Sequence, residues 1–294
     1  MKFNILDTKS IYQRMLATHD DVEREALFRD HIVTPFDGLV HQFGGTDGVA
    51  MFRQWLMSAD QFTGKKSAWA NQLLDQLIHY NAWDKATQAL EDANRAFLPY
   101  QNRIPLESAT FALLICDVNS IPLQRGYSGN GSTPGYIMTL YGDATEYSIS
   151  RLQGATVHEF HHNIRFSLFP FHMGVTVGEY IIAEGLAESF AAELYGEDKV
   201  GFYVTDFDQS RFDETKKIIG DAIHLSGFHQ VRGYIFGDTL SDTMGLPKVG
   251  VPNFAGYAMG YHVVQHYLKQ TGKTVAEATF ASSDEIIRES QFFA

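Results

Sequence analysis

Hydrophobic residues recur at helical spacing along much of this chain, and the pattern predicts a mainly helical protein. Residues 9 to about 100 follow a helical period, with Asn81 as a candidate break within the apolar pattern of Trp69–Pro99. The charged residues of this part are interpreted as solvated helix faces. We expect it to be a scaffold for the remainder of the chain.

The next segment changes to a β pattern. Thr110–Val118 is rich in β-forming apolar residues and predicts a buried strand, and Tyr136–Tyr141 predicts a second one. Between them, Gln124–Gly135 is dense in Gly, Ser and Asn, which is typical of a loop or a wide hairpin. A small sheet is therefore expected at this point.

The helical period returns after the second strand. Ser150 and Gln153 read as a capping box that opens a helix. Four apolar residues at helical spacing form the buried face of that helix: Val157, Phe160, Ile164 and Leu168.

Three more helices are expected toward the C-terminus. Thr176 and Glu179 form a second capping box, which opens a helix over Thr176–Gly196. Gln209–Ala222 and Asn253–Thr271 also show helical patterns, whereas the segment holding His224 and His229 is an uncertain loop. The fold class predicted is α+β, predominantly helical, with a small β-sheet that precedes the helix carrying Val157.

Length and composition fit a single globular protein. With 294 residues the chain can bury a large core, and 45% hydrophobic and 13% aromatic residues argue against broad disorder. No Pro-rich linker or internal repeat is present. We expect a helical N-terminal scaffold lobe over 1–104 and a second lobe over 105–294, which together form one compact unit.

Charge, hydrophobicity and cysteine content limit the binding partners and the cellular location that we expect. The net charge of −12 and the lack of a long basic run argue against nucleic acid or anionic membranes as partners. No apolar stretch is long enough to span a bilayer, and the N-terminus lacks a secretory signal, so a cytoplasmic protein is expected. Cys116, the single cysteine, is expected to be a buried core residue rather than a nucleophile.

The helix predicted to begin at Ser150 carries the motif HExxH. His158 and His162 lie four residues apart and share one helix face, so both imidazoles can reach a single metal ion. Glu159 then faces the open side of the metal, where it can take a proton from bound water. Imidazole ligands suit Zn²⁺, which is the expected cofactor. His161 lies about 100° off the ligand face, and no role is expected for it.

A catalytic zinc needs a third protein ligand. The extended motif HExxHxxGxxH is excluded, because Arg165 and Leu168 occupy its Gly and last His positions. Glu184 lies 22 positions after His162 on the following helix and is the expected third ligand. Glu188, one turn later on the same face, is expected to orient a ligating His, and the alternative is a solvated charge. Gly185 suggests close helix packing beside the metal.

These motifs resemble those of the gluzincin metallopeptidases and, more closely, the bacterial family of predicted zinc-dependent proteases typified by YjaZ. The resemblance covers roughly the last two thirds of the chain. Its segments are Ala155–Arg165, Ala183–Phe190, Gly256–Val263, the Thr-Gly-Lys-Thr run from Thr271, and Ser283–Ser290. It implies a gluzincin-like fold with zinc held by His158, His162 and Glu184.

The resemblance also implies an activity, the hydrolysis of peptide bonds in a peptide or protein substrate. Tyr257 and Tyr261 share a helix face, and either could donate a hydrogen bond to the oxyanion or be a core aromatic. Tyr136–Tyr141 could pair with an extended substrate or be a plain connecting strand. The alternative function is a catalytically silent zinc-binding regulatory or binding protein with a peptidase fold. The oligomeric state is left open.

Two other enzyme classes lack support. A di-iron carboxylate bundle uses the Glu-x-x-His motif twice, and this chain has it once, at Glu159 and His162. The G-x-S-x-G turn of serine hydrolases is absent.

Overall fold

The computed structural model describes all residues, 1–294, as two compact units, Met1–Asn163 and Ile164–Ala294. The predicted boundary between residues 104 and 105 does not coincide with this division. Instead, the division falls within helix α8 (Leu152–Leu168), which is continuous through it. The predominantly helical α+β class is confirmed, with one four-stranded sheet.

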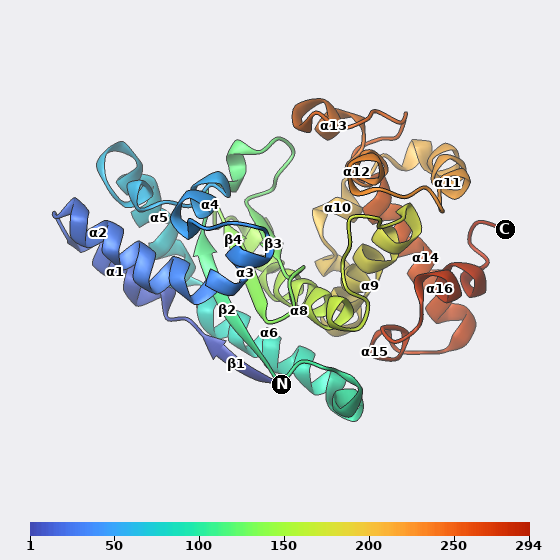
Figure 1. Cartoon of the computed structure of the whole chain (residues 1–294), viewed down its shortest axis with the longest axis horizontal. Coiled ribbons are helices and arrows are strands. Elements are labelled where there is room, and N and C mark those ends of the chain that lie inside the picture. The colour runs from blue at the N-terminus through green and yellow to red at the C-terminus, as the bar shows by residue number, and fades with distance from the viewer. The chain divides into compact units, whose positions relative to one another are not determined.

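The sheet belongs to the first unit and mixes parallel and antiparallel pairs. Its order is β1 (Lys2–Ile5), β2 (Ser108–Ile115), β4 (Tyr136–Tyr141) and β3 (Tyr127–Asn130), as Figure 1 shows. β1, β2 and β4 run parallel to their neighbours, and β3 pairs antiparallel with β4. The strands expected at Thr110–Val118 and Tyr136–Tyr141 are confirmed, and β3 makes the Gly-rich segment one arm of a hairpin.

Most of the chain before and after these strands is helical. Those of the first unit are α1 (Thr8–Ala17), α2 (Asp21–Phe28), α3 (Asp37–Gln42), α4 (Gly48–Gln54), α5 (Ser67–His79), α6 (Ala82–Phe97), α7 (Glu146–Ser150) and the first part of α8. The predicted break at Asn81 is confirmed, because this residue takes a left-handed conformation (φ 53°) between α5 and α6.

Hydrogen bonds join the early helices to the sheet. The Thr8 hydroxyl of α1 donates to the Leu113 carbonyl of β2 (2.6 Å) and accepts from the Trp83 indole of α6 (2.8 Å). The Tyr12 hydroxyl accepts from the Ile115 backbone N–H (3.1 Å). Residues 1–104 are therefore hydrogen-bonded to strand β2, which follows them in the sequence.

Helix α8 is buried through most of its length. The predicted apolar face is confirmed for Val157, Phe160 and Ile164, and Phe160 packs against Phe3 of β1 (ring centroids 6.0 Å apart). The predicted capping box is wrong. α8 begins at Leu152, and the Ser150 hydroxyl donates to the Tyr147 carbonyl at the end of α7.

The second unit is helical. Besides the end of α8 it contains α9 (Val177–Tyr195), α10 (Phe202–Thr205), α11 (Phe212–Asp221), α12 (Phe228–Phe236), α13 (Asp238–Met244), α14 (Ala255–Thr271), α15 (Val275–Ala278) and α16 (Ser283–Ser290). The expected helices at Thr176–Gly196, Gln209–Ala222 and Asn253–Thr271 are confirmed within one to three residues at each end. Most of the segment left as an uncertain loop forms α12 and α13.

Helices α9 and α14 make the closest packing of the second unit. A Cβ added at Gly185 would overlap the Gly260 carbonyl, and one added at Gly260 would overlap the Ile181 carbonyl. The two backbones touch because neither glycine has a side chain. Gly185 thus marks close helix packing, as predicted.

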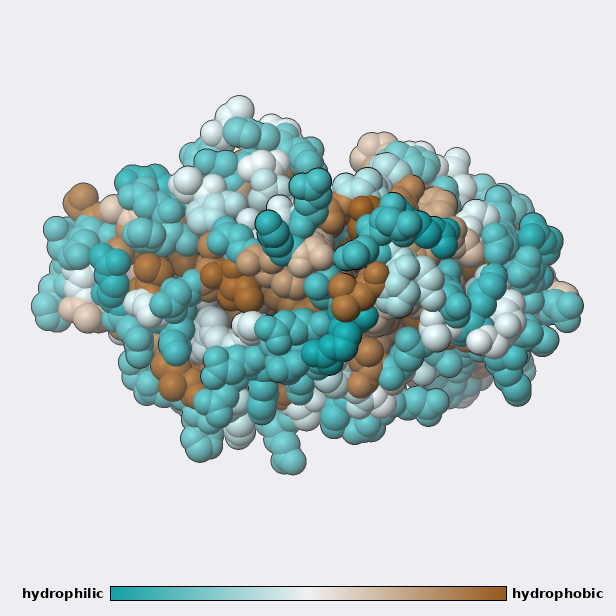
Figure 2. Space-filling model, turned by 90° about the horizontal axis from the view of Figure 1, so that it is seen from below, coloured by the Kyte–Doolittle hydropathy of each residue, from teal (hydrophilic) through white to brown (hydrophobic).

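The molecular surface is mostly hydrophilic on the face drawn in Figure 2, with hydrophobic residues gathered in a few patches. Large apolar side chains exposed in the second unit include Phe169, Phe171, Met173 and Leu225. None of the helices has the length and apolar character needed to cross a membrane.

Candidate metal centre

The HExxH motif lies on α8, and a hydrogen-bonded asparagine next to it fixes the helix to the sheet. Asn163 is fully buried, and its amide nitrogen donates to the carbonyls of Gly131 (2.8 Å), Thr133 (3.1 Å) and Tyr136 (2.7 Å). Its carbonyl oxygen accepts from the Gly135 N–H (2.7 Å). One side chain thus makes hydrogen bonds with four backbone groups of the β3–β4 hairpin.

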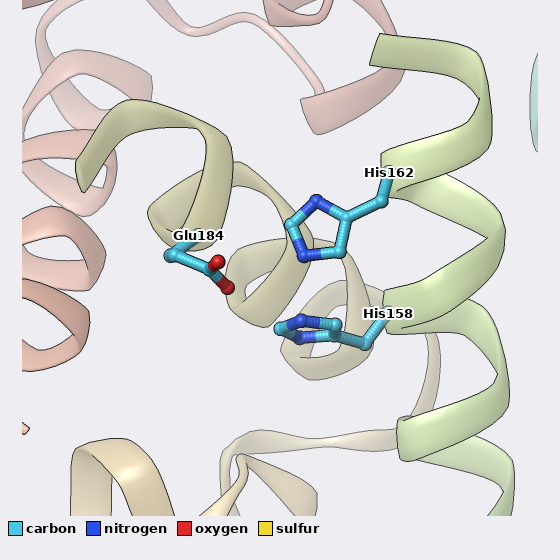
Figure 3. Close-up of side chains that lie close together, drawn as sticks. All are labelled: His158, His162 and Glu184. Atoms are coloured by element: carbon cyan, nitrogen blue, oxygen red, sulfur yellow. The ribbon is translucent and has the colours of Figure 1, made fainter. Parts of the chain in front are cut away.

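The three predicted ligands come together. His158 and His162 of α8 and Glu184 of α9 each offer one ligand atom, and these atoms all lie within 4.8 Å of one another (Figure 3). Their side chains point toward a common point, and the imidazole rings of the two histidines lie 4.5 Å apart in an edge-to-face arrangement. All three residues are at most 9% exposed.

This donor set fits a zinc ion. Two imidazole nitrogens and one carboxylate oxygen are the ligands that catalytic zinc commonly takes from a protein, and three such ligands leave a fourth position for water or substrate. No thiolate competes, because Cys116 is buried elsewhere in the first unit, and burial raises the pKa of its thiol to about 12. Cys116 is therefore a protonated core residue, as expected.

Glu159 lies in close contact with the edge strand β3 and the residues that follow it. A Cβ added at Gly129 of β3 would overlap the Glu159 carboxylate, and one added at Gly131 would overlap the Glu159 backbone carbonyl. The strand and the glutamate can be this close only because both positions are glycine. The candidate proton acceptor is therefore held against β3, the outer strand of the hairpin.

This contact corrects the expectation for Tyr136–Tyr141. That strand, β4, is paired with β2 on one side and with β3 on the other, so it has no free edge for a peptide. The free edge beside Glu159 belongs to β3 (Tyr127–Asn130). Because this segment is rich in Gly, its sequence pattern did not indicate a strand.

Two further polar residues near the ligands are buried. His161 is fully buried, and its ring lies 6.3 Å from that of Phe97. Glu188 is 2% exposed, which argues against a solvated charge, and its carboxylate accepts a hydrogen bond from the Gly201 N–H (2.8 Å).

The two tyrosines of α14 lie in different environments. Tyr257 is buried and stacks on Tyr203 (ring centroids 4.7 Å apart, 21° between planes). Tyr261 is half-buried, and burial, followed by the negative charges of Glu197 and Glu188, raises its pKa to about 12. Its hydroxyl therefore keeps its proton near neutral pH and can donate a hydrogen bond.

Several residues around the site were not anticipated from the sequence. Gly129, Gly131 and Asn163 act through contacts with other elements, so their own positions carry no pattern that a helical or strand period would reveal. The nearest signal was the unusual density of Gly and Asn between residues 124 and 135.

Comparison with known proteins supports a zinc site. Residues 82–288 match the model of a family described as "Predicted Zn-dependent protease (DUF2268)". The chain is also similar to the "Uncharacterized protein YjfC" of Bacillus subtilis (strain 168), with 34% identity over an alignment of 304 positions that covers 99% of both chains. No solved structure matches the chain. The family match confirms the predicted resemblance and the assignment of zinc as cofactor.

Proposed function

Because the chain belongs to this family of predicted zinc-dependent proteases, we propose that it is a zinc-dependent peptidase of the gluzincin type. The observation that carries the proposal is the buried convergence of His158, His162 and Glu184. Glu159, next to the first ligand, adds a base that a purely structural zinc site would not need. A location in the cytoplasm remains part of the proposal.

The zinc ion, when bound, supplies a Lewis acid and lowers the pKa of a water to about 7. Glu159 accepts a proton at its carboxylate during attack on the scissile carbonyl, and then delivers that proton to the leaving amine. Its burial against Gly129 limits the positions that the carboxylate can adopt, so it is oriented before the substrate arrives.

We assign the substrate strand to β3. An extended peptide pairs with the free edge of β3, and its backbone N–H and C=O groups replace the missing neighbour strand. The close contact between Gly129 and Glu159 then places the peptide near the base. In this mode of binding the hydrogen bonds go to the backbone of the peptide, so peptides with a range of side chains can bind.

Tyr261 is the preferred donor to the oxyanion. Its hydroxyl carries its proton at neutral pH because its pKa is raised to about 12, whereas Tyr257 is engaged in a stack with Tyr203. Glu188 is assigned a positioning role. Its hydrogen bond to Gly201 fixes the carboxylate one turn beyond Glu184, where it can orient a ligand.

The proposal is tested by metal analysis and peptide-library cleavage on the purified protein, with and without a chelator. We expect one zinc per chain and cleavage that a chelator abolishes and zinc restores. His158→Ala should lose most of the metal, and His161→Ala, its matched control on the same helix, should retain it.

Glu159→Gln separates metal binding from chemistry. The substitution keeps all three ligands but removes the proton acceptor, so zinc content should stay near one while hydrolysis falls about 10²–10⁴-fold. Activity that survives Glu159→Gln contradicts the assigned base. A wild-type protein that binds zinc but cleaves no peptide would instead be a catalytically silent zinc protein.

A further inference from the structure

Arg232 of α12 is the arginine of the second unit that lacks an oxygen partner. Its guanidinium contacts the Met244 sulfur (3.7 Å) and lies over the rings of Phe228 (5.1 Å) and Phe236 (5.4 Å). The other arginines of this unit all bond to oxygen: Arg165 to the Thr279 and Ala281 carbonyls, Arg211 to Glu214, and Arg288 to Glu289. Arg232 thus carries a positive charge that no carboxylate of the chain neutralises directly.

The surroundings of Arg232 strengthen its attraction for an anion. The side chain is half-buried between aromatic rings, where a charge interaction is screened less than in water. The chain has more acidic than basic residues and a net charge of −12. A shortage of carboxylates therefore does not explain why Arg232 has none as a partner. A guanidinium presents a planar fork of donors that matches a carboxylate.

Aromatic contacts connect Arg232 with the ligand-bearing helix α9. The Phe171 ring meets that of Phe228 (5.3 Å) and that of Tyr180 (6.3 Å), both edge-to-face. Tyr180 precedes Glu184 by four residues and shares its helix face. Arg232 is therefore linked through the rings of Phe228 and Phe171 to Tyr180, one turn before Glu184 on α9.

The electrostatics of Tyr180 agree with this placement. Burial raises the pKa of its hydroxyl above the usual range, the Glu184 carboxylate raises it further, and the Arg232 guanidinium lowers it. One hydroxyl therefore lies in the fields of both charges.

We propose that Arg232 binds a carboxylate of the peptide substrate, next to the aromatic residues that lead to α9 and its proposed ligand Glu184. The proposal rests on the peptidase function and narrows its substrate class to peptides with a negative group near the scissile bond. Phe171 and Met173, which are 39% and 70% exposed, provide apolar surface for the residue that carries this group. The carboxylate can come from the C-terminus of the peptide or from an Asp or Glu side chain.

Binding is measured by titration calorimetry on the zinc-loaded Glu159→Gln protein, which holds a peptide without turnover. The first probe pair is N-acetyl-Ala-Ala-Phe as the free acid and as the C-terminal amide. The second pair is an internal Glu peptide and its Gln counterpart, both blocked at each end. We expect the acidic member of one pair to bind about 10- to 100-fold more tightly, the range for a hydrogen-bonded charge. The pair that responds identifies the source of the carboxylate.

Adding Arg232→Gln should remove the preference for the acidic member, and Arg232→Lys should restore part of it. Arg288→Gln, at an exposed arginine paired with Glu289, is the matched control and should leave the preference unchanged. Equal binding of acid and neutral peptides in both pairs overturns the proposal. A preference for the acidic peptide that survives Arg232→Gln also overturns the proposal, because the metal or another group then binds the carboxylate.

The two proposals fail in different ways. If the wild-type protein cleaves no peptide but Glu159→Gln shows an Arg232-dependent preference for acids, the peptidase function fails and the carboxylate site stands. If cleavage occurs without any such preference, only the carboxylate site fails. Should Arg232→Gln unfold the protein, as seen in its circular dichroism, the comparisons of acid and neutral peptides and the Arg232→Lys protein still decide the question.

Discussion

Helices α8 and α9 carry the proposed metal ligands, and different kinds of contact fix the two helices. α8 is held by hydrogen bonds between Asn163, which donates to three carbonyls and accepts from one N–H, and the backbone of the hairpin. α9 is held by direct backbone contact with α14 at Gly185 and Gly260. A polar attachment fails when an atom is removed, whereas a close-packed one fails when an atom is added.

The largest effect is expected where the polar attachment is removed. Asn163→Ala removes a hydrogen bond from four backbone groups, of which only the Thr133 carbonyl keeps another donor, the Tyr136 N–H. Each buried group left without a partner costs about 1–3 kcal/mol. Allowing for partial relaxation, we expect the free energy of unfolding to fall by about 3–5 kcal/mol. Urea denaturation measures it.

Asn119→Ala is the matched control. Asn119 is exposed and makes one side-chain hydrogen bond to Asp143. Its loss should change the free energy of unfolding by no more than about 0.5 kcal/mol. If the two asparagine variants are equally stable, the hairpin attachment of α8 has no special importance.

A smaller effect, on catalysis, is expected at the contact between β3 and the base. Gly129→Ala pushes a methyl group into the Glu159 carboxylate, and a displacement of about 1 Å can lower turnover about 10²-fold. Zinc content should stay near one per chain. Steady-state kinetics on a peptide that the wild-type protein cleaves, together with metal analysis, checks this expectation.

Ser128→Ala provides the comparison for that strand. Ser128 is adjacent to Gly129, so its side chain points to the opposite face of the sheet. Turnover should change less than about twofold, the size of an ordinary surface substitution. If both variants lose turnover equally, the loss comes from disturbing β3 in general and not from the contact with Glu159.

The packed attachment of α9 is tested by adding one atom. Gly185→Ala places a methyl group on the Gly260 carbonyl, and overpacking of this kind costs about 1–3 kcal/mol. The gain in helix propensity, about 0.5–1 kcal/mol, offsets part of this cost. We expect a net loss of about 1–2 kcal/mol in thermal or urea unfolding.

Gly220→Ala in α11 is the matched helical control. The added methyl group would meet the edge of the Phe293 ring at 3.0 Å, and that side chain lies near the C-terminus. With only a side chain to move, the propensity gain should dominate and leave stability unchanged or raised by up to about 1 kcal/mol. A destabilisation equal to that of Gly185→Ala would contradict the special role of the α9–α14 contact.

The smallest effect is a pH dependence on α14, away from the glycine contact. Burial, and then the nearby His266, lower the pKa of His262 below 6.5. Its ring contacts Phe212, Tyr261 and Phe292, and Lys216 lies over the last of these. Protonation of His262 therefore costs the folded state more than the unfolded state.

The unfolded chain binds more protons at His262 between its lowered pKa and pH 6.5, so stability should rise with pH across that window. His262→Gln should flatten this part of the curve of melting temperature against pH between 5 and 7. If the slope of melting temperature against pH is the same in His262→Gln and in the wild-type protein, the charge of His262 does not affect the stability of α14.

Local signals made part of this structure predictable. Thr176 and Glu179 cap α9, as their spacing predicted. The proposed ligands His158 and His162 followed from helical spacing, because a period of 3.6 residues fixes which side chains share a face. Glu184 followed from its distance along the chain from the HExxH motif. β1 was not predicted, since its partner β2 lies a hundred residues away and its own four residues are too short for a pattern. Arg232 was not singled out, because its neighbours come from other elements.

The two free edges of the sheet have a consequence for self-association. β1 and β3 are each four residues long and leave one side unpaired. A longer exposed edge would recruit strands from other copies of the chain and lead to aggregation. β1 begins with Lys2, and β3 contains Gly129, which offers an incoming strand no side chain to pack against. An edge of this length can hold a short peptide and yet give too few hydrogen bonds to join two whole molecules.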